Sequence, residues 1–174
     1  MKQLDGTGMK RLHREWRRRT EGRLALVLED VQGPFNVGAI IRTAAALRVD
    51  DVWLAGRTPE PSDTKVGKTA LGTDRYLTFH RTDDGPAAVA AARAAGYAVI
   101  AIELTDESSA LHDLPLGDAT ALVVGHEDRG CTAPLLAAVD RVAFLPQLGK
   151  VGSLNVATAA SIACYEVRRQ TWTR

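Results

Sequence analysis

The stretch Phe144-Leu145-Pro146-Gln147-Leu148-Gly149-Lys150-Val151-Gly152-Ser153-Leu154-Asn155 joins a short apolar segment to a long helix expected from Val156 to about Gln170. Its two glycines let the backbone approach a ligand closely, and the first amides of the following helix lack intrahelical acceptors. A loop of this kind at the carboxyl end of a strand favours a ligand site. An ordinary strand-to-helix turn, with Ser153 as the N-cap of the helix, explains the same residues equally well.

Length and composition indicate one soluble globular domain. The chain has 174 residues, of which 45% are hydrophobic and 25% charged. No apolar run reaches membrane-spanning length, and the N-terminus lacks the apolar segment of a secretory signal. Cys131 and Cys164 lie far apart, without the spacing of metal ligands. We therefore expect a reduced, cytoplasmic protein with no membrane partner and no metal.

Positive charge is concentrated near the N-terminus. Residues 1–23 carry eight basic and three acidic side chains, a net charge of +5, whereas the other 151 residues carry 14 basic and 18 acidic ones, a net charge of −4. Clustered Lys and Arg gain affinity for a polyanion by releasing its counterions, and His13 and Trp16 add rings that can stack on bases. The sequence thus divides into a basic arm, residues 1–23, and a body, residues 24–174. A solvated helix or a loose terminal tail is the alternative for the arm.

Apolar runs alternate with helical patterns along the body. Strands are predicted at residues 24–28, 51–55, 76–80, 97–104, 120–124 and 141–145. Helices are predicted at residues 36–48, 85–95, 132–140 and 156–170, with a short one around Lys65 and Lys68. We expect Asn36 to be the N-cap of its helix, Arg42 to lie off its apolar stripe, and residues 106–117 to form a loop or a single turn. The alternation predicts an α/β fold with a mostly parallel sheet and helices on both faces.

Three loops follow predicted strands and are expected to meet at one site: the loop before Asn36, residues 125–130 and residues 147–155. Several other site types are poorly supported. The first strand is not followed by Gly-x-Gly-x-x-Gly, no nucleophile elbow is present, and the four histidines lack metal-ligand spacing. Gly67-Lys68-Thr69 is no phosphate loop, because Ser62 occupies the position of that motif's first glycine.

Three segments resemble the motifs of the TrmH (SpoU) branch of the SPOUT RNA methyltransferases. They are Asn36-Val37-Gly38-Ala39-Ile40-Ile41-Arg42-Thr43-Ala44, Gly125-x-Glu127-x-x-Gly130 and Ser153-Leu154-Asn155-Val156. Their order and spacing match the family, and the resemblance covers residues 24–170. It implies a SPOUT catalytic domain over residues 24–174 with a deep C-terminal trefoil knot. It also implies S-adenosylmethionine as cofactor, S-adenosylhomocysteine as product, and an obligate homodimer with the active site at the subunit interface.

The same resemblance assigns site residues. The catalytic set is Asn36, Arg42, Glu127, Ser153 and Asn155, and Asn36 and Arg42 are expected to face a ribose 2′-hydroxyl across the dimer interface. The cofactor-binding set is Glu103, Leu104, Gly125, Gly130, Leu145, Val151, Ser153 and Leu154. Family mechanisms often make the arginine the base. Because a guanidinium is very hard to deprotonate, fixing an RNA phosphate is the easier role for Arg42, and both roles remain open.

RNA is the partner that the resemblance and the basic arm indicate. The predicted RNA-binding residues are Arg11, Arg14, Arg17, Arg18, Arg19 and Arg42, with Arg168, Arg169 and Arg174 near the C-terminus. The last helix is expected to present one face to the dimer, although core packing accounts for the same face; its residues are Val156, Ala160, Ala163, Cys164 and Val167.

The substrate expected first is tRNA, methylated on a guanosine 2′-hydroxyl, with ribosomal RNA second. Glu103-Leu104-Thr105 and Pro146-Gln147 resemble the eukaryotic-type tRNA guanosine-2′-O-methyltransferase domains. The chain departs from the common family pattern at His126, where many members have Asn or Pro, and at Asp128, where many have Gly. Two functions of other classes stay open: a non-catalytic RNA-binding or assembly protein with the same fold, and a small-molecule methyltransferase.

Overall fold

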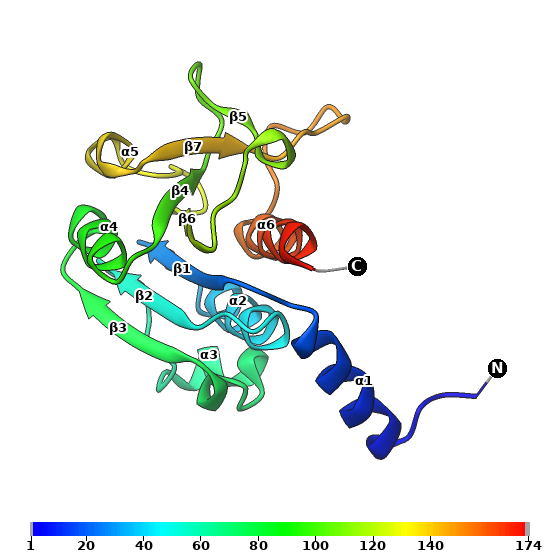
Figure 1. Cartoon of the computed structure of the whole chain (residues 1–174). Coiled ribbons are helices and arrows are strands. Elements are labelled where there is room, and N and C mark those ends of the chain that lie inside the picture. The colour runs from blue at the N-terminus through cyan, green and yellow to red at the C-terminus, as the bar shows by residue number, and fades with distance from the viewer. Residues whose placement is uncertain (1, 173–174) are drawn as a thin grey trace.

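The computed structural model describes residues 2–172 (Figure 1). The strands are β1 (Arg23–Glu29), β2 (Asp51–Ala55), β3 (Thr78–Thr82), β4 (Ala98–Ile102), β5 (Ser109–Ala110), β6 (Ala119–Val124) and β7 (Arg141–Phe144). The helices are α1 (Gly6–Arg18), α2 (Pro34–Ala46), α3 (Thr64–Ala70), α4 (Gly85–Ala94), α5 (Ala133–Ala138) and α6 (Val156–Thr171), with 3-10 turns η1 (Asp74–Tyr76) and η2 (Leu111–Asp113). None of the described helices combines the length and the apolar character that crossing a membrane requires.

The strands form one sheet in the order β3-β2-β1-β6-β4-β7-β5. Every pairing between these strands is parallel, and Leu26 of β1 lies opposite Val52 of β2 on one side and Leu122 of β6 on the other. The mostly parallel α/β sheet is therefore confirmed. The trefoil knot stays a prediction.

Helices cover both faces of the sheet, as predicted (Figure 1). Leu24, Leu26 and Leu28 of β1 pack in the core under α2, α3 and α6. Ala25 and Val27 of the same strand pack in the core under α4 and α5. Because both faces of β1 are buried, its sequence is a continuous apolar run and not an alternation.

Two predicted boundaries are wrong for local reasons, and one short strand was missed. Helix α2 begins at Pro34 with Gly33 as N-cap, so Asn36 lies in its first turn and is not the cap; proline is well tolerated there because the first amides need no partner. Strand β3 starts at Thr78, because residues 74–76 form a 3-10 turn. Residues 106–117, expected to form a loop or a single turn, contain the single turn η2, but also the short strand β5, which was missed.

The face of α6 that was expected in a dimer lies in the core of its own chain. Ala160, Ala163 and Val167 are at most 2% exposed and pack with the leucines of β1. The alternative of simple core packing therefore accounts for this face. The apolar side chains that α6 leaves exposed are Ile162 and Tyr165.

The prediction that Arg168 holds RNA is also wrong. Its side chain is 2% exposed, and its guanidinium donates to the carbonyl oxygens of Leu47, at 2.8 Å, of Gly22, at 3.1 Å, and of Arg48. Arg169 forms an exposed ion pair with Glu166. Arg174 lies outside the described residues.

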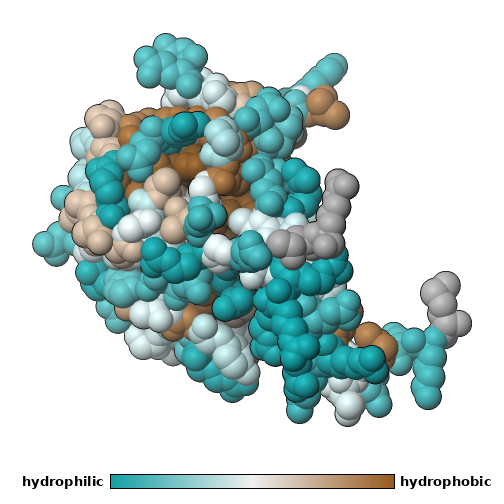
Figure 2. All heavy atoms as spheres, viewed as in Figure 1, coloured by the Kyte–Doolittle hydropathy of each residue, from teal (hydrophilic) through white to brown (hydrophobic). Residues whose placement is uncertain are grey.

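The basic arm is mostly a helix that projects from the body (Figure 1). Helix α1 has no buried residue, and its visible side is hydrophilic in Figure 2. Arg23, placed in the arm by the sequence, belongs to β1. The ring of Trp16 lies 5.0 Å from the ring of Trp172, so this tryptophan anchors α1 to the end of α6 and is only partly free to stack on a base.

Candidate active site

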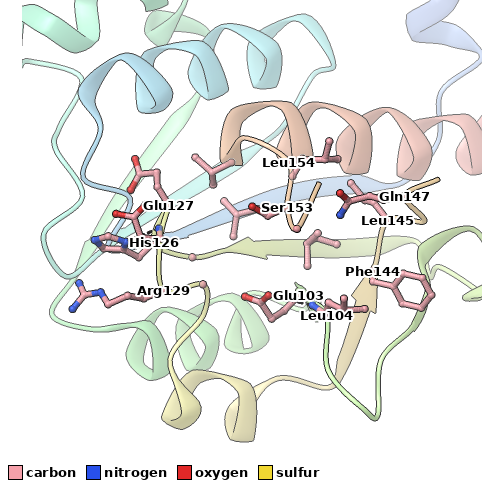
Figure 3. Close-up of a pocket in the computed structure, with 18 of the residues that line it drawn as sticks. Glu103, Leu104, His126, Glu127, Arg129, Phe144, Leu145, Gln147, Ser153 and Leu154 are labelled. Atoms are coloured by element: carbon pink, nitrogen blue, oxygen red, sulfur yellow. Dashed lines mark hydrogen bonds between the residues drawn. The ribbon is translucent and has the colours of Figure 1, made fainter. Parts of the chain in front are cut away.

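A cavity of about 600 Å³ lies at the carboxyl ends of β4, β6 and β7. Its walls come from the loops that follow these three strands and from the first turns of α6. Two of the three loops predicted to meet, residues 125–130 and 147–155, thus lie together. Figure 3 shows one end formed by His126, Glu127 and Arg129, the other by Phe144, Leu145 and Gln147, and the space between them flanked by Glu103 and Leu104 on one side and Ser153 and Leu154 on the other.

Every residue of the predicted cofactor set lines this cavity: Glu103, Leu104, Gly125, Gly130, Leu145, Val151, Ser153 and Leu154. Four further lining residues, outside the predicted loops and motif segments, were missed: Ile102, Val124, Phe144 and Ala159. These residues end strands or lie in the first turn of α6. The parallel topology therefore predicts where they lie, whereas their residue types give no sign of a ligand site.

Glu127 connects this cavity to the third predicted loop. Its Oε1 accepts from the Gly33 amide at 2.7 Å and from Asn36 Nδ2 at 3.0 Å, and its Oε2 accepts from the Gln32 amide at 3.2 Å. The two backbone donors were missed by the sequence analysis because no side chain marks them. The carboxylate therefore fixes the start of α2 against the loop that follows β6.

Asn36 extends the network to α6. Its Oδ1 accepts from Asn155 Nδ2 at 3.0 Å, and Asn155 Oδ1 accepts from the amides of Ala157 and Thr158 at 3.0 and 3.3 Å. Asn155, and not Ser153, is thus the N-cap of α6. Three of the five predicted catalytic residues, Glu127, Asn36 and Asn155, form one connected network, and Ser153 lies in the adjacent cavity wall.

Burial alone would raise the pKa of Glu127, but the hydrogen bonds from Asn36 and from the amides of Gly33 and Gln32 stabilise its ionised form and lower the pKa from 4.5. Because the pKa is lower in the folded state, the stabilisation is complete above pH 4.5 and is lost as the pH falls through the folded value. At neutral pH this carboxylate is an acceptor held by three donors.

Glu127→Gln is expected to lower the free energy of unfolding at pH 7 by about 1 kcal/mol, because the amide cannot accept from all three donors and solvent screens part of the effect. Denaturant unfolding measured at pH 7 and pH 3 should show this difference shrinking at the lower pH. Glu107→Gln, an exposed glutamate without a hydrogen-bond partner among the described residues, is the control. A loss that is equal at both pH values contradicts the role given to the ionised carboxylate.

A tight loop holds the second motif in place. His126 and Gly130 exchange backbone hydrogen bonds of 3.1 and 2.8 Å, and Glu103 Oε2 accepts from the Cys131 amide at 2.9 Å. Gly130 has a φ of +67°, and a Cβ atom there would lie 2.2 Å from Glu103 Oε2. The backbone angle favours glycine, and a Cβ atom would also displace the Glu103 carboxylate from the Cys131 amide.

Gly130→Ala is expected to lower the free energy of unfolding by about 1–3 kcal/mol, because it combines a strained φ with displacement of Glu103. Thermal unfolding measures the loss. Gly117→Ala is the matched control, since its Cβ meets no atom within 4 Å and its φ is not in the left-handed region. Equal stability of the two variants contradicts this account.

Arg42 is not brought to this network within one chain. Its side chain is exposed on α2, and its guanidinium has no hydrogen-bond or ion-pair partner among the described residues. The predicted RNA-binding residues Arg11, Arg14, Arg17 and Arg18 are exposed on α1, whereas Arg19 is partly buried with its guanidinium 4.5 Å from the ring centre of Trp16.

Among the described residues, no group of three or more His, Cys, Asp or Glu side chains is arranged to hold a metal ion.

Comparison with known proteins agrees with this geometry. The family model described as "SpoU rRNA Methylase family" matches residues 23–165, from the start of β1 into α6. The chain belongs to the SpoU rRNA methylase family. The matched region contains all three motif segments and the whole cavity.

Curated relatives of this SpoU chain act on more than one kind of RNA. It is 34% identical over 150 residues to an uncharacterised tRNA/rRNA methyltransferase of Synechocystis sp., covering 86% of this chain and 54% of the relative. It is 32% identical over 152 residues to the tRNA (guanosine(18)-2′-O)-methyltransferase of Escherichia coli, covering 84% and 63%. It is 34% identical over 146 residues to the 23S rRNA (guanosine(2553)-2′-O)-methyltransferase RlmP of Bacillus subtilis, covering 84% and 58%. The chain thus spans less than two thirds of each relative.

Solved structures show the same SpoU fold. An S-adenosylmethionine-bound rRNA methyltransferase from Sinorhizobium meliloti superposes with a TM-score of 0.81 at 29% identity, covering 89% of this chain and 59% of that chain. The SpoU methyltransferase AviRb from Streptomyces viridochromogenes, in complex with S-adenosylmethionine, superposes with a TM-score of 0.77 at 28% identity, covering 86% and 61%.

Proposed function

We propose that this chain transfers a methyl group from S-adenosylmethionine to a ribose 2′-hydroxyl of RNA. The observation that carries the proposal is the meeting of the three motif segments: Glu127, Asn36 and Asn155 form a network beside a cavity lined by all eight predicted cofactor residues. The two S-adenosylmethionine-bound SpoU structures of similar fold support the choice of cofactor.

The cavity fits the cofactor by size and lining. Its volume of about 600 Å³ lies in the range of small-molecule sites. Glycines at positions 125 and 130 bring backbone to the wall, and Leu145, Val151 and Leu154 supply apolar surface on which an adenine ring can lie. At the opposite wall, Glu103 would accept hydrogen bonds from polar groups of the cofactor, and Leu104 adds apolar surface. When bound, the cofactor supplies a methyl group activated by a sulfonium.

The chain's own residues position the acceptor. Glu127 is an unsuitable base, because its ionised form is already held by three donors and its pKa is lowered. Its role is to orient Asn36, whose second Nδ2 hydrogen remains available for a ribose oxygen. Asn155 fixes the other side of that amide. Correct placement of the hydroxyl relative to the methyl group accounts for most of the rate.

Arg42 completes the site from a second copy of the chain in this proposal. Within one chain it lies exposed on α2 and outside the network. The Arg42 side chain of the partner would bind, as a guanidinium, the phosphate next to the target ribose, in which case the hydroxyl proton passes to water; or, as the deprotonated guanidine, it would accept the hydroxyl proton itself. The proposal therefore includes the homodimer and, by resemblance to SPOUT proteins, the C-terminal knot.

The substrate proposed first is tRNA, with ribosomal RNA second and a cytoplasmic location for either. Relatives of both kinds are 32% and 34% identical to this chain over the aligned residues, so the comparison supports RNA more strongly than one RNA class. The exposed arginines of α1 would bind the RNA backbone outside the active site.

The test is transfer of labelled methyl groups to separate pools of unmodified tRNA and ribosomal RNA, followed by nuclease digestion. Label on a ribose 2′-oxygen supports the proposal and identifies the RNA class. Cofactor binding without label in either pool overturns catalysis by this chain and favours the non-catalytic RNA-binding protein. Transfer to a small acceptor without salt-sensitive RNA binding favours a small-molecule methyltransferase.

Replacing Arg11, Arg14 and Arg18 by alanine is expected to weaken RNA binding at least tenfold at low salt. The three residues lie on one face of α1. The slope of log affinity against log salt should fall by up to about 3, since each lost phosphate contact removes close to one unit. Alanine at Arg57, Arg75 and Arg141 makes the same charge change on the exposed body and is the control. Equal slopes in the two triple variants exclude α1 from RNA binding.

A further inference from the structure

The end of the cavity beside Glu127 carries two cationic or hydrogen-donating side chains that have no role so far. His126 and Arg129 belong to the loop closed by the backbone bonds between residues 126 and 130. Both line the cavity, and Figure 3 shows their side chains at the same end of it, away from Leu145 and Gln147.

The loop fixes the hydrogen-bonding state of His126. Its Nδ1 accepts from the Asp128 amide at 3.0 Å, so the neutral ring carries its hydrogen on Nε2. In the described part of the chain, neither this Nε2 nor the Arg129 guanidinium has a hydrogen-bond or ion-pair partner. His126 Nε2 and the Arg129 guanidinium are therefore two donors without a partner among the described residues, at this end of the cavity.

We propose that His126 and Arg129 form a phosphate-binding pair that holds the RNA strand next to the target ribose. The inference rests on the proposed RNA methyl transfer. An N–H on an imidazole and a planar guanidinium suit the oxygens of a backbone phosphate, and Arg129 is exposed, as a site for a strand that remains partly in water requires. Glu127, the neighbouring residue, orients Asn36, so the pair lies beside the ribose-facing side of the site.

The carboxylate of S-adenosylmethionine is the competing occupant of this pair. The cofactor also carries a sulfonium and an ammonium group, and a guanidinium nearby opposes both charges. A backbone phosphate carries no positive group of its own that the guanidinium would repel. Two carboxylates lie near the pair: Glu127 is held by three donors, whereas Asp128 is exposed and has no partner for its carboxylate among the described residues. The negative charge of Asp128 should weaken phosphate binding by the pair. Removing that charge should therefore strengthen RNA binding, the opposite of the effect expected for loss of His126 or Arg129.

The experiment measures the affinity of each variant for the RNA pool that wild type methylates, by fluorescence anisotropy at several salt concentrations, and its affinity for S-adenosylmethionine by calorimetry. Arg129→Ala is expected to weaken RNA binding about tenfold and to lower the salt slope by about 1. His126→Ala should weaken RNA binding about threefold, and Asp128→Asn should strengthen it about twofold. Cofactor affinity should stay within about twofold of wild type in all three variants.

Arg141→Ala is the matched control, because Arg141 is an exposed arginine at the opposite, amino-terminal end of β7. RNA affinity equal to wild type in Arg129→Ala overturns the inference. A loss of cofactor affinity with unchanged RNA binding by the cofactor-free protein also overturns it and assigns the pair to the cofactor carboxylate. These outcomes differ from failure of the proposed function, in which wild type itself transfers no methyl group to RNA.

Discussion

Arg42→Ala is expected to lower kcat for RNA methyl transfer at least about 100-fold while cofactor affinity stays within about twofold. Arg42 is exposed on α2 and does not line the cavity of its own chain, so its loss leaves the cofactor walls intact. Single-turnover transfer and calorimetric titration of S-adenosylmethionine measure the two quantities separately.

Arg75→Ala is the control for Arg42→Ala, since Arg75 is exposed in the 3-10 turn after α3 and contacts its neighbour Tyr76. Arg42→Lys keeps the charge but loses the planar fork, so it should remain well below wild type in either role of the arginine. Full activity of Arg42→Ala removes Arg42 from the mechanism. A loss of cofactor affinity equal to the loss of rate assigns it to the cofactor site of its own chain.

Arg168→Met is expected to destabilise the fold by about 3 kcal/mol, which corresponds to a decrease in Tm of about 6–12 °C. The substitution keeps the apolar volume but leaves the carbonyl oxygens of Leu47, Arg48 and Gly22 without their donor, and removes the partner of Asp50 at 3.7 Å. Thermal unfolding followed by circular dichroism gives the value.

Arg169→Met is the neighbouring control, because within residues 2–172 the Arg169 side chain pairs with Glu166 alone, at the surface of α6. Its Tm should stay close to that of wild type. If Arg168→Met instead unfolds at the temperature of wild type and loses RNA affinity, Arg168 is an RNA-binding residue and its burial in the structure is contradicted.

The middle of the sheet was predictable because the strands β1, β2, β4 and β6 are mostly buried and apolar on both faces. The prediction of a buried strand at residues 24–28 is confirmed by β1, where Leu24 to Leu28 are 0% exposed. Helix and strand ends were less predictable, because they depend on a few local bonds. The amide of Leu77 bonds to the Asp74 carbonyl and closes a turn that delays β3, and no apolar pattern contains that information.

The surroundings of a buried face were not predictable either. Periodicity correctly marks Ala160, Ala163 and Val167 as one face of the last helix, but it does not say whether that face meets its own sheet or another subunit. Arg168 shows the same difficulty with charge. An arginine near a C-terminus is usually solvated, and only the tertiary structure reveals three backbone carbonyls around it.

The site was more predictable than the helix ends because chemistry restricts its residues. The motif containing Gly125, Glu127 and Gly130 predicted a loop that the structure places at the cavity. The amides of Gln32 and Gly33, which hold Glu127, have no side-chain signature and were missed. The approach of Asn36 to Asn155 joins residues 119 positions apart, and both the expected meeting of the loops and the motif resemblance indicated it.

The proposed active site combines Asn36 from one chain with Arg42 from its partner. Mixing the two inactive variants Asn36→Ala and Arg42→Ala tests it most directly. In a mixed dimer one site has both wild-type residues, so an equal mixture with free subunit exchange should recover about one quarter of wild-type activity. Recovery of that size supports a shared site. No recovery, although differently tagged subunits co-purify as mixed dimers, contradicts it.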